Sequence, residues 1–197
     1  MKPAVIVVDM LEGNYRKSRN GTREEEKIIV PARGFLAEAR SLSIPVVFAC
    51  DSFLKDDFIF KGKMGVHALR GTEGVRPLRE LEPAATDIIL EKRRFSAFFK
   101  TDLDQTLRTL GVDTAVVCGI QTQFFVLATA FDAFCHDFQT FILEDLTASS
   151  LSRVHENFME PYRRSVLYPI FRVMKSCEFL ALCRHDGTQG EQDRAGV

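Results

Sequence analysis

The sequence predicts an α/β fold in which a mostly parallel sheet of about six strands lies between two layers of helices. Three observations support this prediction. Short apolar runs rich in β-branched residues alternate with longer segments of helical period, as in parallel βαβ units. The runs lack polar alternation, which indicates strands buried on both faces. The 197 residues can also form one core of ordinary size. These features are typical of a Rossmann-like, three-layer domain.

Each predicted strand is a short apolar run that ends at a polar residue or a glycine. The first run, AVIVV, ends at Asp9, and the second, PVVFAC, ends at Asp51. The third and fourth runs end at Glu91 and Gly119. The predicted strands cover residues 4–8, 45–50, 87–90, 114–118 and 139–143, with a sixth near Phe171.

Segments of helical period lie between these runs. An apolar stripe at helical spacing predicts one helix against the sheet, and another segment is apolar on most sides. Thr101 and Thr122 are the expected N-caps of two helices, because a threonine hydroxyl can accept a hydrogen bond from a free N–H of the first turn. The predicted helices cover residues 28–42, 101–110, 122–136, 152–163 and the segment after the sixth strand.

The chain is expected to form one domain over residues 1–183. Residues 184–197 are polar and rich in glycine, and we expect them to be a disordered tail. Two connections, residues 11–27 and 51–83, are much longer than ordinary loops. Connections of this length often form lids or walls of a binding site.

The composition argues against several classes of partner. A formal net charge of -1 and a pI near 6.4 argue against nucleic acids and anionic membranes, and favour a small-molecule substrate. The five cysteines are odd in number and show no CxxC spacing, which is typical of neither a secreted disulfide framework nor a zinc site. The N-terminal apolar run is too short for a signal peptide or a membrane span. We therefore expect a cytoplasmic location.

Polar residues that follow the strands are the first candidates for chemistry. In open parallel sheets, ligands bind beyond the carboxyl ends of the strands. Asp9, Asp51, Lys92 and the turn over residues 119–125 occupy such positions. A buried lysine stays charged only beside a carboxylate, so Asp9 and Lys92 are expected to pair. Such a pair can transfer a proton.

Three segments resemble the isochorismatase-like cysteine hydrolases, which include nicotinamidases, carbamoylsarcosine amidases and isochorismatases. They are AVIVVDM, the stretch from IILEKRRFSAFF to VLATAFDAF, and EDLTASS. The resemblance extends from residue 4 to about residue 180. It implies a parallel α/β sheet covered on both faces, and a homodimer or larger homo-oligomer.

The resemblance also implies roles for individual residues. Amidase members of the family use an Asp, a Lys and a Cys, in which the thiol attacks the carbonyl carbon and the Asp moves the proton. By this resemblance Asp9 is the catalytic acid and base, Lys92 is its partner, and Phe125 occupies the position of the nucleophile. Backbone N–H groups of Gln121 and Phe125 would stabilise an oxyanion. Phenylalanine has no nucleophilic atom, so an ordinary thiol-dependent amidase is not expected.

None of the cysteines is well placed to substitute. Cys118 lies inside a predicted strand, and Cys135 lies about 15 Å farther along the predicted helix. Cys50, at the end of the second strand, is the remaining candidate, although no motif supports it.

The resemblance further implies where a substrate or a metal ion would bind. Nicotinamidases hold an ion through an Asp-x-His after the second strand and a later His. Asp51 and His67 fit two of these places, but Phe53 replaces the first His, which leaves too few ligands for a tetrahedral site. We therefore expect no metal and no cofactor, with Asp51, Phe53, His67 and Thr122 around the substrate pocket.

The phenylalanines near the turn allow two interpretations. They either line an apolar substrate pocket or serve core and interface packing. This group consists of Phe95, Phe98, Phe99, Phe124 and Phe125.

Two functions stay open. Isochorismatases cleave a vinyl ether by protonation from the Asp and need no thiol, so the chain is expected to be a hydrolase acting on a small amide or vinyl ether. The alternative is a catalytically impaired relative that binds a small molecule or a protein partner.

Overall fold

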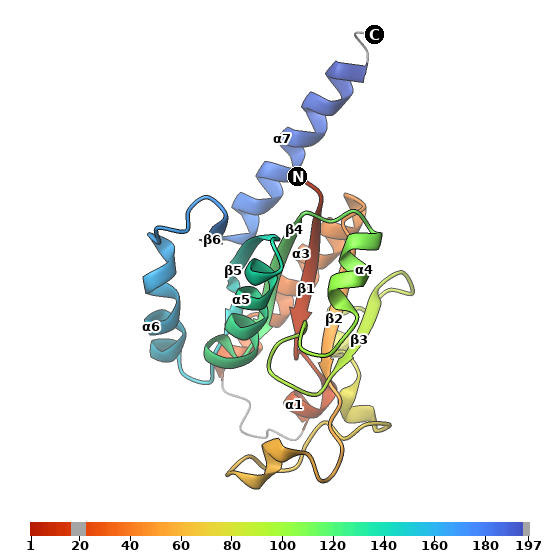
Figure 1. Cartoon of the computed structure of the whole chain (residues 1–197), viewed down its shortest axis with the longest axis vertical. Coiled ribbons are helices and arrows are strands. Elements are labelled where there is room, and N and C mark those ends of the chain that lie inside the picture. The colour runs from red at the N-terminus through yellow and green to blue at the C-terminus, as the bar shows by residue number, and fades with distance from the viewer. Residues whose placement is uncertain (17–22, 195–197) are drawn as a thin grey trace.

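The computed structural model describes residues 1–16 and 23–194 as a three-layer α/β structure around one parallel sheet (Figure 1). The sheet has six strands in the order β3-β2-β1-β4-β5-β6, and every neighbouring pair is parallel. Its strands are β1 (Pro3–Val8), β2 (Val46–Asp51), β3 (Ile88–Lys92), β4 (Thr114–Ile120), β5 (Gln139–Ala148) and β6 (Phe171–Met174). The predicted fold class is confirmed.

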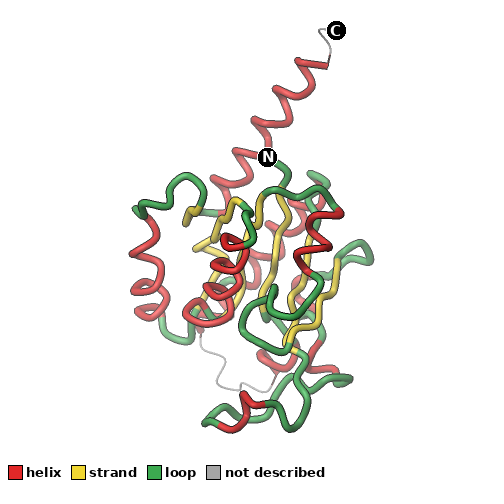
Figure 2. The backbone as a smooth tube through the Cα atoms, viewed as in Figure 1, coloured by secondary structure: helices red, strands yellow, loops and turns green. Residues whose placement is uncertain are grey.

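Two hydrophobic clusters lie on opposite faces of this sheet, because alternate residues of each strand point to opposite sides. Val5 and Val7 of β1 belong to the first cluster, whereas Ala4 and Ile6 belong to the second. Helices therefore cover both faces, as Figure 2 shows.

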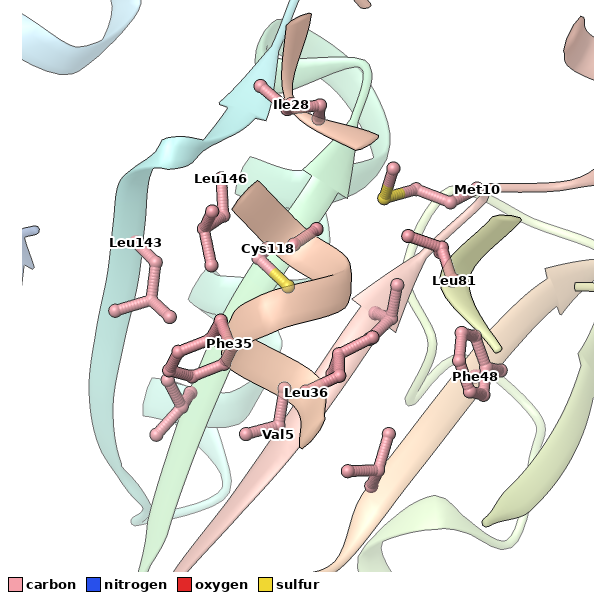
Figure 3. Close-up of a cluster of buried hydrophobic side chains, with 14 of the residues drawn as sticks. Val5, Met10, Ile28, Phe35, Leu36, Phe48, Leu81, Cys118, Leu143 and Leu146 are labelled. Atoms are coloured by element: carbon pink, nitrogen blue, oxygen red, sulfur yellow. The ribbon is translucent and has the colours of Figure 1, made fainter. Parts of the chain in front are cut away.

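The first cluster is covered by α3 (Ile29–Ser41) and the start of α7 (Ser176–Arg194). Figure 3 shows Phe35 and Leu36 of α3 packed among strand residues such as Val5 and Leu143. The second cluster is covered by α4 (Leu103–Thr109), α5 (Leu127–Cys135) and α6 (Ser152–Arg163).

Several short elements surround the carboxyl ends of the strands. Helices α1 (Glu12–Arg16) and α2 (Arg23–Lys27) lie in the first long connection. The second long connection contains three short 3-10 turns, and a π-helical turn joins β4 to α5. These turns are Phe58–Lys61, Glu73–Val75, Arg79–Leu81 and the π-turn Thr122–Val126.

Four strands extend beyond their predicted ends. β2 includes Asp51 and β3 includes Glu91 and Lys92, whereas β4 continues to Ile120 and β5 continues to Ala148. Polar residues interrupt the apolar pattern at the ends of β2, β3 and β5, and Gly119 interrupts it in β4, although the backbone ladder continues. The pairing of β4 with β5 shifts register after Val117, which accommodates the longer β5.

Both predicted threonine caps are wrong. α4 begins at Leu103 after Asp102, and Thr101 lies one residue too early, although its hydroxyl accepts a 3.3 Å hydrogen bond from the Leu103 N–H. Thr122 lies within the π-turn, where its hydroxyl bonds to a side chain of α6.

The C-terminal segment differs from the predicted tail. α7 continues to Arg194, so residues 184–194 are helical, and Figure 1 shows this end projecting from the sheet. A helix satisfies its backbone hydrogen bonds locally and can therefore form where little apolar surface is buried. The last three positions of the predicted tail, 195–197, lie outside the described residues. No helix in the described part of the chain combines the length and apolar character that crossing a membrane requires.

Candidate active site

Asp9 stands at the carboxyl end of the central strand β1. Its φ of 53° lies in the left-handed region, where a residue with a side chain is strained by roughly 1 kcal/mol or more. Two contacts hold this conformation: the Asp9 N–H donates to Ala49 O, and the Asn14 side-chain amide donates to Asp9 O. The carboxylate is thereby fixed beside the ends of β2 and β3.

Lys92 lies between two carboxylates. Its Nζ is 2.6 Å from Asp9 Oδ2 and 2.5 Å from Asp51 Oδ1, and it also donates to Arg94 O at 3.3 Å. Asp51 and Lys92 are partners in the register of β2 and β3, which places them side by side. The Asp51 N–H donates to Asp9 Oδ1 at 2.8 Å. The structure thus brings Asp9, Asp51 and Lys92 together, and all three side chains are buried.

Burial sets the protonation behaviour of this triad. Loss of water, with a smaller effect from the charge of Asp51, raises the pKa of Asp9 to about 7, although Lys92 opposes the change. Burial also raises the pKa of Asp51. For Lys92, burial lowers the pKa, but the two carboxylates outweigh this effect and raise it overall. Lys92 therefore stays charged, while Asp9 can both donate and accept a proton near neutral pH.

Phe125 lies on the π-turn and faces the triad. Its ring centroid is 4.6 Å from Lys92 Nζ, a distance typical of a cation–π contact. The ring also packs edge-on against Phe95 at 4.8 Å. A hydrocarbon ring therefore occupies the place beside the triad where a nucleophile is expected.

A cavity of about 380 Å³ opens over Asp9 and Asp51. Of the predicted pocket residues, Asp51 and His67 line it, and Phe125 and Gln121 contribute as well. The full lining is Asp9, Asn14, Glu25, Asp51, Met64, His67, Ile120, Gln121, Phe124, Phe125 and Ser150.

Two predicted pocket residues do not line this cavity. Phe53 is fully buried and packs its ring edge-on against Phe60 and His67. Thr122 is also fully buried, and its hydroxyl shares a 2.9 Å hydrogen bond with His155 Nδ1. Their positions in the chain are close to the site, but their side chains point into the packing around it.

Gln121 connects the two sides of the cavity. Its side-chain oxygen accepts from the Ser150 N–H at 3.0 Å, and its side-chain amide donates to Glu25 of α2. The Ile120–Gln121 peptide bond is cis. Among the described residues, no backbone oxygen accepts a hydrogen bond from the Gln121 N–H, and its predicted role as an oxyanion donor stays a prediction. The same role for the Phe125 N–H stays a prediction.

Four residues that line the cavity were not predicted from the sequence, namely Asn14, Glu25, Met64 and Ser150. The first three lie in the two long connections, whose length indicated walls of a binding site but not which side chains face it. Ser150 belongs to the EDLTASS segment, in which the motif itself was the available signal.

The group of phenylalanines divides between two cavities and the core. Phe124 and Phe125 line the cavity over the triad, whereas Phe95 and Phe99 line a larger neighbouring groove of about 760 Å³. Phe98 is buried and stacks on His136. Four of the five rings therefore line a cavity or groove and one packs in the core, while a role of these rings in substrate binding stays a prediction.

Thiols and metal ligands are not gathered at this cavity. Cys50 and Cys118 belong to the first cluster, on the other side of the sheet from Phe125. Burial raises the pKa of both thiols, that of Cys118 to about 12. Across residues 1–16 and 23–194, no three His, Cys, Asp or Glu side chains are grouped so that they could hold a metal ion.

Several known proteins are similar to this chain in sequence or in fold. The protein YwoC of Bacillus subtilis, described as an uncharacterized isochorismatase family protein, is 41% identical over 161 residues, which cover 79% of this chain and 82% of that protein. Phenazine biosynthesis protein PhzD1 of Pseudomonas aeruginosa is 38% identical over 88 residues, 45% of this chain, and this match spans only 42% of that protein. The crystal structure of N-carbamoylsarcosine amidase from Thermoplasma acidophilum superposes with a TM-score of 0.77 at 32% identity, covering 89% of this chain and 97% of that one.

The sequence pattern of one protein family matches most of the chain. Residues 3–170 match the isochorismatase domain, and this range includes both long connections, the triad and the π-turn. On this basis, the chain belongs to the isochorismatase family.

Proposed function

We propose that this chain is a hydrolase that cleaves a small amide or vinyl ether, with Asp9 as general acid and base, Lys92 as its charge partner and no thiol nucleophile. The observation that carries the proposal is the Asp9 carboxyl group, which lines an open cavity and has its pKa raised to about 7 by burial. A carboxyl group with this pKa is present in both protonation states near neutral pH. Membership in the isochorismatase family supports hydrolysis as the reaction type.

A vinyl ether would react through protonated Asp9. The carboxylic acid donates its proton to the terminal carbon of the double bond, and positive charge develops on the carbon bonded to oxygen. Water adds to that carbon and returns a proton to Asp9. The hemiketal then breaks its C–O bond and releases an alcohol and a ketone. Lys92 stabilises the carboxylate that exists between the two proton transfers.

An amide would react through ionised Asp9. The carboxylate accepts a proton from water as the water oxygen attacks the carbonyl carbon. The Gln121 N–H would donate to the oxyanion, and Asp9 would then protonate the leaving amine. The name of the N-carbamoylsarcosine amidase supports an amide-type substrate for this fold.

The test compares the native protein with Asp9→Asn and Phe125→Cys on a panel of amides and vinyl ethers. We expect native activity to fall by at least about 100-fold in Asp9→Asn, because general acid–base catalysis typically contributes this much or more. Asp56→Asn is the matched control, since Asp56 is exposed and does not line the cavity over Asp9. Equal rates for the native protein and Asp9→Asn would refute the proposed role of Asp9.

A second candidate is a binding protein that has lost its nucleophile. The contact between the Phe125 ring and Lys92 favours it, because the ring fills the place beside the triad. Activity that appears only in Phe125→Cys would support this candidate. The new thiol should then react with an alkylating agent faster than the native cysteines, and an unchanged alkylation rate would show that position 125 is not the nucleophile position.

We also propose that the protein acts as a homo-oligomer in the cytoplasm. Exposed aromatic side chains around the larger groove support association, and the odd number of cysteines supports a reducing compartment.

A further inference from the structure

We propose that the cavity over Asp9 selects cationic or uncharged ligands and rejects carboxylates, and that Glu25 is a specificity-determining residue. The inference rests on the proposed function in so far as the ligand is a substrate. The physical basis of this inference is the charge of the residues that line the cavity. Ligand affinities report on this charge even if no ligand is cleaved.

Negative groups dominate the wall of this cavity. The carboxyl groups of Asp9, Asp51 and Glu25 all line it, whereas no Lys or Arg belongs to its described lining. Lys92 is the nearest cation, but its side chain is fully buried and already contacts both aspartates. A carboxylate ligand would therefore meet like charges, and the described lining offers it no free Lys or Arg to pair with.

Neighbouring arginines are held elsewhere. Arg93 forms a bidentate contact with Asp57, at 2.5 and 3.1 Å, and Arg94 also reaches Asp57 at 3.4 Å. This acid is nearly fully buried, and hydrogen bonds from Arg93 are the main cause that lowers its pKa to about 2. Both cations are thus fixed beside the cavity instead of within it.

Glu25 adds a carboxyl group to the cavity wall and forms no ion pair with Lys92 of the triad. The side chain is 7% exposed, and one of its oxygens accepts from the Gln121 amide. Among the described side chains, no cation lies within ion-pair distance of Glu25. Its charge also contributes, after burial, to the raised pKa of Tyr15. Within the described side chains, Glu25 therefore adds a carboxylate to the cavity wall without adding a cation.

Aromatic rings add to the same preference. Phe124 and Phe125 form part of the wall, and the faces of aromatic rings carry partial negative charge. The contact between Lys92 and the Phe125 ring shows that a cation is already accommodated there. Carboxylates and ring faces together favour a planar, positively charged or neutral group.

Three ligands of nearly equal shape test this inference on the full chain. Benzamidine is cationic at neutral pH, benzamide is uncharged, and benzoate is anionic. Titration calorimetry of the native protein should give the affinity order benzamidine, benzamide, benzoate, with at least about a tenfold difference between the first and the last, the equivalent of about 1.4 kcal/mol.

Glu25→Gln should reduce the ratio of benzamidine to benzoate affinity by about three- to tenfold, because it removes the charge and retains an oxygen that can accept from Gln121. Glu26→Gln is the matched control, since it removes the same charge from an exposed residue of the same helix. This control should leave the ratio unchanged.

Separate outcomes address the two proposals. Benzoate binding as tightly as benzamide, an equal effect of both glutamine variants, or no binding of any of the three would overturn the charge preference. None of these results depends on cleavage. An inactive native protein with the expected order of affinities would contradict the proposed hydrolysis and support the charge preference.

Discussion

Lys92 is the residue on which the protonation of the site depends. Two buried carboxylates lie within 2.6 Å of its Nζ, and without this cation they would repel one another in a region from which water is excluded. The ammonium group lets both acids stay close to the cavity. Removing a buried partner costs more than the pair contributes, because the two remaining carboxylates lose the counterion that they share.

Lys92→Met should therefore lower the free energy of unfolding by roughly 3–5 kcal/mol near neutral pH. The pKa of both aspartates would rise further in the folded variant, so the native state would bind more protons than the unfolded state. Stability of the variant should then fall as pH rises from about 5 to about 8. Urea denaturation across this range is the measurement, with exposed Lys55→Met as the control. A variant as stable as the native protein at pH 8 would contradict the assignment.

The pKa of Asp9 also predicts the pH dependence of catalysis. Burial raises it to about 7, so the protonated fraction falls about tenfold for each pH unit above that value. Cleavage of a vinyl ether, which needs the acid, should decline with this slope. Cleavage of an amide, which needs the base, should instead rise with pH and level off above about 7. Rate measurements from pH 5 to 9 distinguish the two routes, and a profile without an inflection near 7 would exclude Asp9 from either.

At the scale of elements, the contact between β1 and β4 controls the position of the π-turn. Gly119 pairs with Val8 and has a φ of +115°, which residues with a side chain rarely adopt. An added Cβ would lie 2.1 Å from Val8 O, so the two strands could not keep their spacing. This glycine therefore determines how closely the turn carrying Phe125 approaches Asp9.

Gly119→Ala should destabilise the protein by roughly 2–4 kcal/mol, because it adds both backbone strain and a backbone clash. Gly34→Ala is the matched control. Nothing lies within 4 Å of the Cβ it would add, and Gly34 is in α3, so alanine there should stabilise by about 0.5–1 kcal/mol. Thermal unfolding measures both variants, and similar melting temperatures would contradict this account of the β1–β4 contact.

The periodicity of apolar residues predicted those strands that are stabilised by burial of their own apolar side chains. The strands β1 (Pro3–Val8) and β2 (Val46–Asp51) contain continuous apolar runs, and the structure places both inside the sheet, away from its edges. The end of β3 was missed, because Lys92 is polar and its burial depends on acids far away in the sequence. Thr122 was assigned to a cap for a similar reason, since its partner His155 lies on another helix.

The candidate site, like the fold, was predicted only in part from the sequence. Asp9, Asp51 and Lys92 follow from their positions at strand ends, and the structure brings them together. Glu25 could not be found in this way, because its contact with Gln121 depends on how the first long connection folds over the sheet.

On the scale of the whole molecule, one face carries a cluster of exposed aromatic rings. Phe58 is 74% exposed and Phe99 is 48% exposed, and both line the groove of about 760 Å³ beside the active-site cavity. Apolar surface of this kind usually contacts a partner. Lys61 and Asp132 line the same groove, so two copies could pair opposite charges across it.

Phe99→Ser should therefore weaken association by about tenfold or more if this face joins copies of the chain. Sedimentation equilibrium measures the effect. Val166→Ser is the control, because Val166 is 99% exposed and does not line the groove. Unchanged association in Phe99→Ser would place the interface elsewhere, and a monomeric native protein would contradict the predicted oligomer.

The ring of Phe125 has a practical consequence for chemical proteomics. Electrophilic probes identify thiol hydrolases by forming a covalent bond with the active-site sulfur. No cysteine belongs to the described lining of the cavity over Asp9, and the probe would find a hydrocarbon ring at position 125. Covalent labelling of an active-site thiol would therefore not register this cavity, and a probe that labels the exposed Cys135 or Cys177 would report on other surfaces, whereas a reversible ligand of the cavity immobilised on a resin would retain the protein.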